Sequence, residues 1–236
     1  MEKALDARLG EIAWELSGLA VAVLRGGEVS YEGYFGRRFI DPDNPEHGQP
    51  IDRHTKFRVA SISKTVAAIG AMALVDRGLI DLDCDISDYL GFKLRNPHWP
   101  DHPITAAMLL SHTSSLRDAS GYSLGLGHRL EEFFLPGSEA YDEGRHFADR
   151  GPGSYYSYAN LGYGVLATAM EKASGERFDL YMLRHVLKPL GIDGSHNVLL
   201  LSNEGFADLA ALYRKGSDEE TWEPDGPWRA QVDDYR

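Results

Sequence analysis

Apolar and polar residues alternate at helical spacing at the start of the chain and at strand-like spacing soon after. The first apolar series is Leu5, Leu9, Ile12 and Leu16. This spacing predicts an amphipathic helix over residues 3–17. Residues 19–24 and 28–35 are rich in aliphatic and aromatic side chains, and Gly26-Gly27 between them can adopt the positive φ angles of a tight turn. We therefore expect a β-hairpin, followed by a short strand and turn near residues 50–55.

Helical periodicity dominates the middle of the chain. The clearest case is residues 61–77, for which the expected buried stripe is Val66, Ile69 and Ala73. Thr105 is a suitable N-cap residue for the helix that follows it. The remaining helices are expected over residues 105–110, 161–173, 178–187 and 206–213.

The spacing of turn residues divides the chain into three parts. Residues 1–56 hold the N-terminal helix and hairpin, residues 57–200 are mainly helical, and residues 201–236 form an acidic segment. Within it, residues 215–236 have few aliphatic side chains and no clear period. We expect this last part to be loosely ordered. Residues 117–153 carry scattered glycines and predict long loops with one helix near 130–134. Long loops inside a domain often carry its substrate-facing surface.

Composition excludes several classes of partner. The chain has 236 residues, 43% of them hydrophobic, and a formal net charge of −12. This acidity argues against nucleic acid or an anionic membrane surface as a partner, because both require a basic face. No stretch approaches the roughly 20 apolar residues of a membrane helix, and the start lacks the apolar core of a signal peptide. The sequence therefore predicts a cytoplasmic protein. The single cysteine, Cys84, can form no intrachain disulfide and has acidic neighbours that disfavour a thiolate.

Candidate chemistry begins with Ser61 and Lys64, at the start of the predicted helix over residues 61–77. Residues three apart on a helix share a face, so the hydroxyl and the amine can meet. A serine hydroxyl becomes a good nucleophile only when a neighbouring base takes its proton. A lysine with the ordinary pKa of about 10.4 is charged at neutral pH, but burial or a helix N-terminus can lower that pKa. The pattern fits an acyl-transfer nucleophile, and equally a helix cap followed by a solvated lysine.

A second candidate group is Tyr158 with Asn160. A tyrosine can act as a general acid or base when a neighbouring cation stabilises its phenolate. An amide two residues further on could hold the lysine and contact a substrate carbonyl. Taken alone, Tyr158 also fits one more aromatic in a tyrosine-rich loop, and Asn160 fits a helix cap.

Together these motifs resemble the penicillin-recognising serine hydrolases, in particular class C β-lactamases, family-VIII esterases and D-amino-acid peptidases. The motifs are FRVASISK at residues 57–64, LSHTS at residues 110–114 and YANLGY at residues 158–163. The resemblance spans about residues 19–191. It implies an α+β fold of the β-lactamase/transpeptidase type, with a helical domain and an antiparallel sheet to which the N-terminal helix and hairpin contribute.

The resemblance also implies roles for individual residues and a substrate class. Ser61 would be the acylated nucleophile, with Lys64 as proton acceptor or electrostatic partner. The backbone N–H of Ser61 would form half of an oxyanion hole. Tyr158 would carry the proton to the leaving group, and Asn160 would contact Lys64 and the substrate carbonyl. His112 is interpreted as a structural, capping histidine. The implied substrates are small esters, amides or β-lactams, with no cofactor.

The sequence departs from the family pattern in one respect. Family members carry a third motif, Lys-Thr-Gly or His-x-Gly, on a later strand, and this sequence contains no K-[ST]-G or H-x-G. Lys215-Gly216 and His47-Gly48 have the wrong spacing. We therefore expect the chain to correspond to the N-terminal portion of the family fold, with an incomplete sheet. A second chain, self-association through the open edge, or an altered compact fold would each satisfy that edge.

Three functional hypotheses follow. The first is a serine hydrolase that forms a covalent acyl-enzyme, and the alternative is a catalytically impaired fragment or a binding or scaffold protein of the same fold. The third, a metalloenzyme, is disfavoured because the nine histidines are scattered and no H-x-x-x-H or H-E-x-x-H motif occurs. We expect no metal site.

Overall fold

A computed structural model describes residues 2–14, 16–41, 44–119, 121–125, 127–215 and 228–230. The chain divides into two compact units. The sheet unit comprises Met1–Val59 and Asn197–Arg236, and the helical unit comprises Ala60–His196. The three-part division expected from the sequence stays a prediction.

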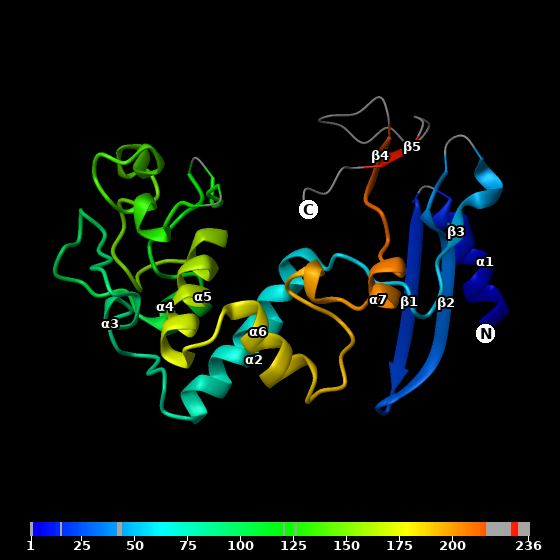
Figure 1. The fold of residues 1–236 in the computed structure, drawn as a ribbon, viewed down its shortest axis with the longest axis horizontal. Helices are drawn as coiled ribbons and strands as arrows, with labels where there is room; N and C mark the ends of the chain where they lie inside the picture. The colour runs from blue at the N-terminus through cyan, green and yellow to red at the C-terminus, as the bar shows by residue number, and fades with distance from the viewer. Residues whose placement is uncertain are drawn as a thin grey trace. The chain divides into compact units, whose positions relative to one another are not determined.

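The sheet unit begins with a helix and a hairpin, as predicted (Figure 1). Its first elements are α1 (Glu2–Ala13), β1 (Gly18–Arg25), β2 (Glu28–Phe39) and β3 (Gln49–Pro50), and the strands form an antiparallel sheet in the order β1-β2-β3. Gly26 and Gly27 have φ angles of 61° and 85°, which produce the tight turn between β1 and β2. Helix α1 ends four residues earlier than residue 17, where the prediction placed its end.

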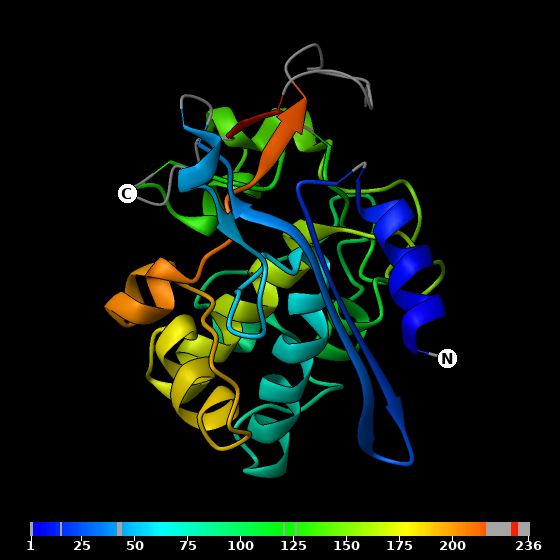
Figure 2. The ribbon, with the colours of Figure 1, turned by 90° about the vertical axis from the view of Figure 1, so that its right-hand side faces the viewer.

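Helix α1 lies alongside the hairpin (Figure 2). The Tyr31 hydroxyl on β2 donates a hydrogen bond of 2.6 Å to Asp6 Oδ1 on α1. Ile12 on α1 is 47% exposed, and Trp14, the residue directly after the helix, is 62% exposed. The sheet unit therefore presents apolar side chains on α1 as well as on the hairpin, where Leu24 and Val29 are also exposed.

The C-terminal part of the sheet unit corrects one prediction. Helix α7 (Asn203–Ala207) is short, and the helix predicted over residues 206–213 does not form. Asp208 forms a turn at the end of α7, and the residues after it pair with distant backbone instead. Ala210 N–H donates to the Lys56 carbonyl (2.9 Å) and Ala211 N–H donates to the Arg38 carbonyl (2.8 Å). Backbone pairing with distant residues thus overrides the local apolar spacing.

Strand β4 (Tyr213–Lys215) pairs with β5 (Trp228–Ala230). Residues 201–215 and 228–230 therefore have defined structure, and the rest of the acidic segment, for which loose order was predicted, lies outside the described residues. Arg38 of β2 forms ion pairs with Asp52 (3.1 Å) and Asp208 (3.3 Å), which connect the early and late segments of the sheet unit.

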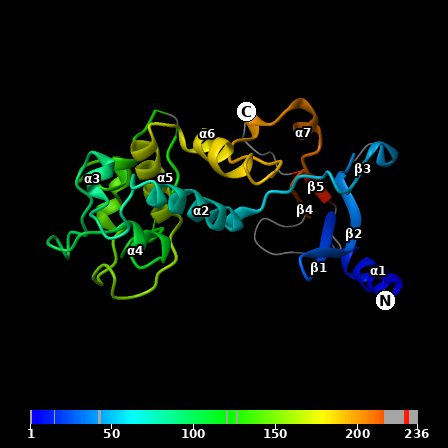
Figure 3. The same cartoon turned by 90° about the horizontal axis from the view of Figure 1, so that it is seen from below.

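The helical unit is built around α5 (Figures 1 and 3), with α3 and α4 on one part of it and α2 and α6 on another. The predicted helices over 105–110, 161–173 and 178–187 all form, the last as α6 followed by a π-helical turn. The elements in chain order are η2 (Ala60–Ile62), α2 (Ser63–Asp76), α3 (Ser87–Leu90), α4 (Ala106–Leu110), η3 (Leu130–Phe133), η4 (Glu139–Gly144), α5 (Asn160–Ser174), α6 (Phe178–Met182) and η5 (Leu183–Leu187).

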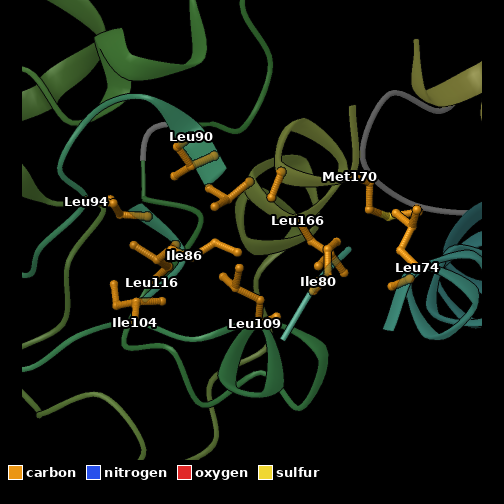
Figure 4. Close-up of a cluster of buried hydrophobic side chains, with 14 of the residues drawn as sticks. Leu74, Ile80, Ile86, Leu90, Leu94, Ile104, Leu109, Leu116, Leu166 and Met170 are labelled. Carbon is orange, nitrogen blue, oxygen red and sulfur yellow. The ribbon is translucent and has the colours of Figure 1, made fainter. Parts of the chain in front are cut away.

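The core of the helical unit is a continuous group of buried aliphatic side chains from α2, α3, α4, α5 and the intervening loops (Figure 4). Leu74, Ile86, Leu109, Leu116 and Leu166 are at most 1% exposed. Each fully buried side chain of this size stabilises the fold by about 1.5–3 kcal/mol relative to its exposed state. This core holds fixed the ends of α2 and α5, on which the candidate site lies.

The buried face of α2 differs from the predicted one. Ile69, expected to be buried, is 49% exposed, and the buried positions are Ala67, Gly70, Ala71 and Leu74. Apolar residues surround most of this helix, so their spacing does not define a single face. Gly70 selects the face: a Cβ at that position would lie 2.4 Å from Met182 Sδ. Small residues let α2 approach α6 closely.

The loops over residues 117–153 contain the predicted helical turn, η3, and a second one, η4, that was not predicted. Asn96 is fully buried and joins three parts of this region. Its side-chain amide donates to Ser115 Oγ (3.1 Å) and to the Ala148 carbonyl (2.7 Å), and its Oδ1 accepts from His98 N–H (3.0 Å).

None of the helices in the described part of the chain has the length and apolar character needed to cross a lipid bilayer.

Candidate active site

Ser61 lies in the turn that leads into α2. Residues Ala60–Ile62 form a single 3₁₀ turn and α2 begins at Ser63. Ala60 has a φ of 44°, in the left-handed region that non-glycine residues seldom adopt. Strained backbone of this kind is often found at functional sites. The Ser61 side chain is exposed at the N-terminal end of α2, where the first N–H groups of a helix lack intrahelical acceptors.

The four residues predicted from the sequence converge at this turn. Lys64 Nζ donates to Ser61 Oγ (3.1 Å) and to Asn160 Oδ1 (2.7 Å). The Ser61 and Tyr158 hydroxyls are 2.6 Å apart, and either can be the donor. Lys64 Nζ also lies 4.9 Å from the centre of the Tyr158 ring. A hydroxyl, an amine, a phenol and an amide from two distant segments thus form one hydrogen-bonded cluster.

The electrostatics of the cluster act mainly on Tyr158. Hydrogen bonding to the Lys64 ammonium, and next to the Ser61 hydroxyl, lowers the pKa of Tyr158 below the ordinary value of a phenol. Partial burial and the charge of Asp118 act in the opposite direction but are outweighed. A phenol with a lowered pKa, in contact with a serine hydroxyl, is suited to accept the serine proton.

His112 packs against the ring of Tyr158 and binds the backbone next to it. Its Nδ1 accepts a hydrogen bond from Ala159 N–H (3.2 Å), and its ring centre lies 4.5 Å from that of Tyr158. Burial, followed by the nearby charge of Lys64, lowers the pKa of His112. A histidine whose Nδ1 accepts a hydrogen bond carries no proton on that nitrogen. These contacts fit a histidine that supports the Tyr158 segment structurally.

Asp118 was not among the predicted site residues. Its carboxylate accepts hydrogen bonds from Asn160 N–H (2.8 Å), Leu161 N–H (2.8 Å) and the Asn160 side-chain amide (2.7 Å). Asp118 therefore caps the N-terminus of α5 from another segment of the chain. The alternative prediction, that Asn160 is the helix cap, is wrong: the N-cap residue is Ala159, and its side chain makes no capping hydrogen bond. No local signal marks Asp118, since its partners lie over 40 residues away in the sequence.

Comparison with known proteins places this geometry in a family. The family model described as beta-lactamase matches residues 5–235 of the chain. The chain belongs to the beta-lactamase family. Its α+β architecture, helix-rich with a three-stranded antiparallel sheet, is the β-lactamase/transpeptidase fold predicted from the sequence.

Relatives within the beta-lactamase family include a peptidase and an esterase. The chain is 30% identical over 179 residues to the D-alanyl-D-alanine-carboxypeptidase/endopeptidase AmpH of Escherichia coli, covering 75% of the chain and 44% of AmpH. It is 31% identical over 194 residues to the esterase EstB of Burkholderia gladioli, covering 75% of the chain and 46% of EstB. The chain thus spans less than half the length of these relatives.

A solved structure of the beta-lactamase fold gives the same result in three dimensions. The octameric penicillin-binding protein homologue from Pyrococcus abyssi superposes with a TM-score of 0.73 at 26% identity, covering 97% of this chain and 50% of that one. Nearly all of this chain therefore corresponds to about half of a larger protein of the same fold.

The described residues hold no group of three or more histidine, cysteine, aspartate or glutamate side chains arranged to bind a metal ion. Cys84 is exposed, and its hydrogen bond with Asp81 raises the pKa of the thiol. Ser61 Oγ, in contrast to the Cys84 thiol, lies within hydrogen-bond reach of both an ammonium and a phenol hydroxyl.

Proposed function

We propose that this protein is a serine hydrolase that forms a covalent acyl-enzyme on Ser61 with a small ester, amide or β-lactam. The observation that carries the proposal is the hydrogen-bonded chain from Lys64 Nζ to Ser61 Oγ (3.1 Å) and from Ser61 Oγ to the Tyr158 hydroxyl (2.6 Å). In this arrangement the hydroxyl has a proton acceptor and a neighbouring cation within direct contact. Those are the requirements for an activated serine.

Acylation follows from the contacts. As Ser61 Oγ attacks the substrate carbonyl, its proton passes to the Tyr158 oxygen and a C–O bond forms. The Lys64 ammonium stabilises the negative charge on the phenolate before the transfer. Collapse of the tetrahedral intermediate breaks the bond to the leaving nitrogen or oxygen, which takes the proton from Tyr158. The Ser61 N–H, in the 3₁₀ turn that precedes α2, supplies one donor to the oxyanion.

Deacylation reverses the same proton transfers. Water attacks the acyl carbon as Tyr158 accepts its proton, and a new C–O bond forms. The bond between the acyl carbon and Ser61 Oγ then breaks, and Ser61 Oγ takes the proton from Tyr158, which releases the acid and restores the free hydroxyl. Asn160 accepts from Lys64 throughout and keeps the ammonium beside Ser61 and Tyr158. Its position in the cluster supports a second role as a contact for the substrate carbonyl.

The names of the relatives support the substrate class. AmpH is named a D-alanyl-D-alanine carboxypeptidase and EstB an esterase, so amides and esters are both substrates of proteins with similar sequences. The Pyrococcus homologue is octameric, which supports self-association of this chain, and a second chain that extends the three-stranded sheet is the other arrangement we consider. We also propose a cytoplasmic location, from the sequence alone.

An activated-ester assay tests the proposal. The wild-type chain, incubated with a p-nitrophenyl ester of a short acid, is expected to release p-nitrophenolate, and Ser61→Ala should lower the rate by about three orders of magnitude or more. Ser63→Ala, which changes a neighbouring serine at the start of α2, is the matched control and should retain the wild-type rate.

An unchanged rate in Ser61→Ala would refute the proposal. So would a wild-type chain that neither hydrolyses the ester nor forms a covalent adduct on Ser61 with a fluorophosphonate. That second outcome would support the alternative, a binding or scaffold protein of the same fold.

A further inference from the structure

Resting on the proposed function, we propose that Asp118 is a positioning residue of this site: it fixes the orientation of the Asn160 amide, and through it the place of Lys64 beside Ser61 and Tyr158. Asp118 does not contact Ser61, Lys64 or Tyr158 by any hydrogen bond among the described residues, so it acts through Asn160.

The carboxylate makes three hydrogen bonds that no other side chain type would satisfy in the same way. Its Oδ2 accepts from both the backbone and the side-chain amide of Asn160, and its Oδ1 accepts from Leu161 N–H. A carboxylate is acceptor-only at both oxygens. An asparagine in its place would turn a donor toward one of these three N–H groups.

The orientation of the Asn160 amide depends on this contact. A side-chain amide has one accepting end and one donating end. Asp118 binds the donating end at 2.7 Å, which leaves Oδ1 to accept from Lys64 Nζ at 2.7 Å. The reversed amide would place its NH₂ group against the ammonium and its oxygen against the carboxylate. The carboxylate therefore selects the rotamer in which Asn160 holds Lys64.

The segment that carries Asp118 is itself firmly supported. Leu116 is fully buried and pairs with Phe147 in a short antiparallel bridge. Arg117 Nε donates to the Arg145 carbonyl (2.7 Å). The same segment carries His112, which accepts from Ala159 N–H, so three consecutive amides at residues 159–161 are held from residues 112–118.

Asp118 also has an electrostatic effect that a purely structural residue would lack. The charged and titratable groups around Tyr158 are Lys64, Asp118, His112 against its ring, and Tyr163. The pKa of Tyr163 is raised by burial and next by the charge of Tyr158. The Lys64 cation lowers the pKa of Tyr158, whereas the Asp118 anion raises it. Replacing Asp118 with a neutral residue removes this anion, but it also releases Lys64, whose hydrogen bond is the largest cause of the lowered pKa of Tyr158. The pKa of Tyr158 should therefore rise, and the pH dependence of Ser61 reactivity should move to higher pH.

The test measures the rate at which a fluorescent fluorophosphonate labels the full chain, as a function of pH, for wild type and Asp118→Asn. In this reaction Ser61 Oγ forms the bond to phosphorus, fluoride leaves, and Tyr158 takes the serine proton. We expect Asp118→Asn to label about 10- to 100-fold more slowly at neutral pH, as displaced catalytic groups typically do. The rise of the rate with pH should begin at higher pH than in wild type, because the displaced Lys64 no longer lowers the pKa of Tyr158.

A double-mutant cycle shows whether Asp118 acts through Asn160. In an Asn160→Ala background, the Asp118→Asn substitution should change the labelling rate by less than about threefold, because the pathway is already broken. Asp85→Asn is the matched control: Asp85 also accepts a backbone N–H near a helix start, that of Ser87, and pairs with Arg95, so its loss tests general destabilisation. Its labelling rate and pH dependence should stay at the wild-type values.

If Asp118→Asn does not fold, as judged by circular dichroism, Asp118→Glu replaces it. Glutamate keeps the charge but displaces the carboxylate, so the rate should fall and its rise with pH should again begin at higher pH than in wild type. Wild-type rate and pH dependence in the Asp118 variant, or an equal loss in both backgrounds of the cycle, would overturn the proposal. A wild-type chain not labelled on Ser61 would instead overturn the proposed function.

Discussion

Asn96→Ala is the substitution whose effect follows most directly from the structure. Asn96 is fully buried and makes three hydrogen bonds, to Ser115 Oγ, the Ala148 carbonyl and His98 N–H. Ser115 and Ala148 are themselves 1% and 3% exposed, so water cannot easily replace the lost amide. The substitution removes the connection between the loop at residue 96 and the segments around residues 115 and 148.

The expected loss of stability is about 3 kcal/mol. Each hydrogen bond contributes about 1 kcal/mol net, and a buried group left without its partner costs about 1–3 kcal/mol. Three bonds give about 3 kcal/mol, with the two buried partners, Ser115 and Ala148, favouring the upper part of the range. The segment that contains Ser115 also carries His112 and Asp118, so the variant should loosen the candidate site before the helical unit unfolds.

Urea denaturation followed by tryptophan fluorescence measures this loss, with Trp99 close to the altered loop. Lys93→Ala, at an exposed position of the same loop, is the control and should change the free energy of unfolding by no more than about 0.5 kcal/mol. An Asn96→Ala variant within 1 kcal/mol of wild type, at an unchanged denaturant slope, would refute the reasoning that these bonds support the loop.

Three further predictions concern the site and the packing of α2. Tyr158→Phe should slow labelling of Ser61 by about 10²- to 10⁴-fold, the usual contribution of a general base. The melting temperature should not fall, because Tyr158 is 43% exposed. An unchanged labelling rate would contradict the role of Tyr158 as base. The labelling rate of wild type should rise with pH as the phenol of lowered pKa deprotonates, and Lys64→Met, which removes the cation that lowers this pKa, should move the rise to higher pH; a rise at the same pH would show that Lys64 does not act on Tyr158. Gly70→Val should destabilise the chain by about 1–3 kcal/mol in urea denaturation, because the new side chain would overlap Met182, and a neutral effect would mean that α2 and α6 are loosely packed.

Local sequence features predicted the parts of the fold and site that depend on local geometry. The hairpin at Gly26-Gly27 follows from turn chemistry, and the proximity of Ser61 and Lys64 follows from helical spacing. The meeting of this pair with Tyr158 and Asn160 does not follow from spacing, since nearly a hundred residues separate them. It was predicted only from the resemblance of the motifs to a known family.

The features that the sequence did not predict depend on long-range contacts. Asp118 has no motif around it, and only the folded chain brings it to Asn160. Residues 206–213 have helical apolar spacing, but their backbone pairs with Arg38 and Lys56 instead. Ile69 was assigned to the wrong face because α2 is apolar on most sides, and the small residue Gly70 decides which side faces α6.

The central claim is that Ser61 is activated by Lys64 and Tyr158, and peptide mapping tests it most directly. The wild-type chain and Tyr158→Phe are each treated with a fluorophosphonate for the same short time, digested, and analysed by mass spectrometry. We predict a single adduct on the peptide that contains Ser61 in the wild type, and little or none in Tyr158→Phe. An adduct spread over several serines, or the same extent of Ser61 modification in both proteins, would contradict the claim.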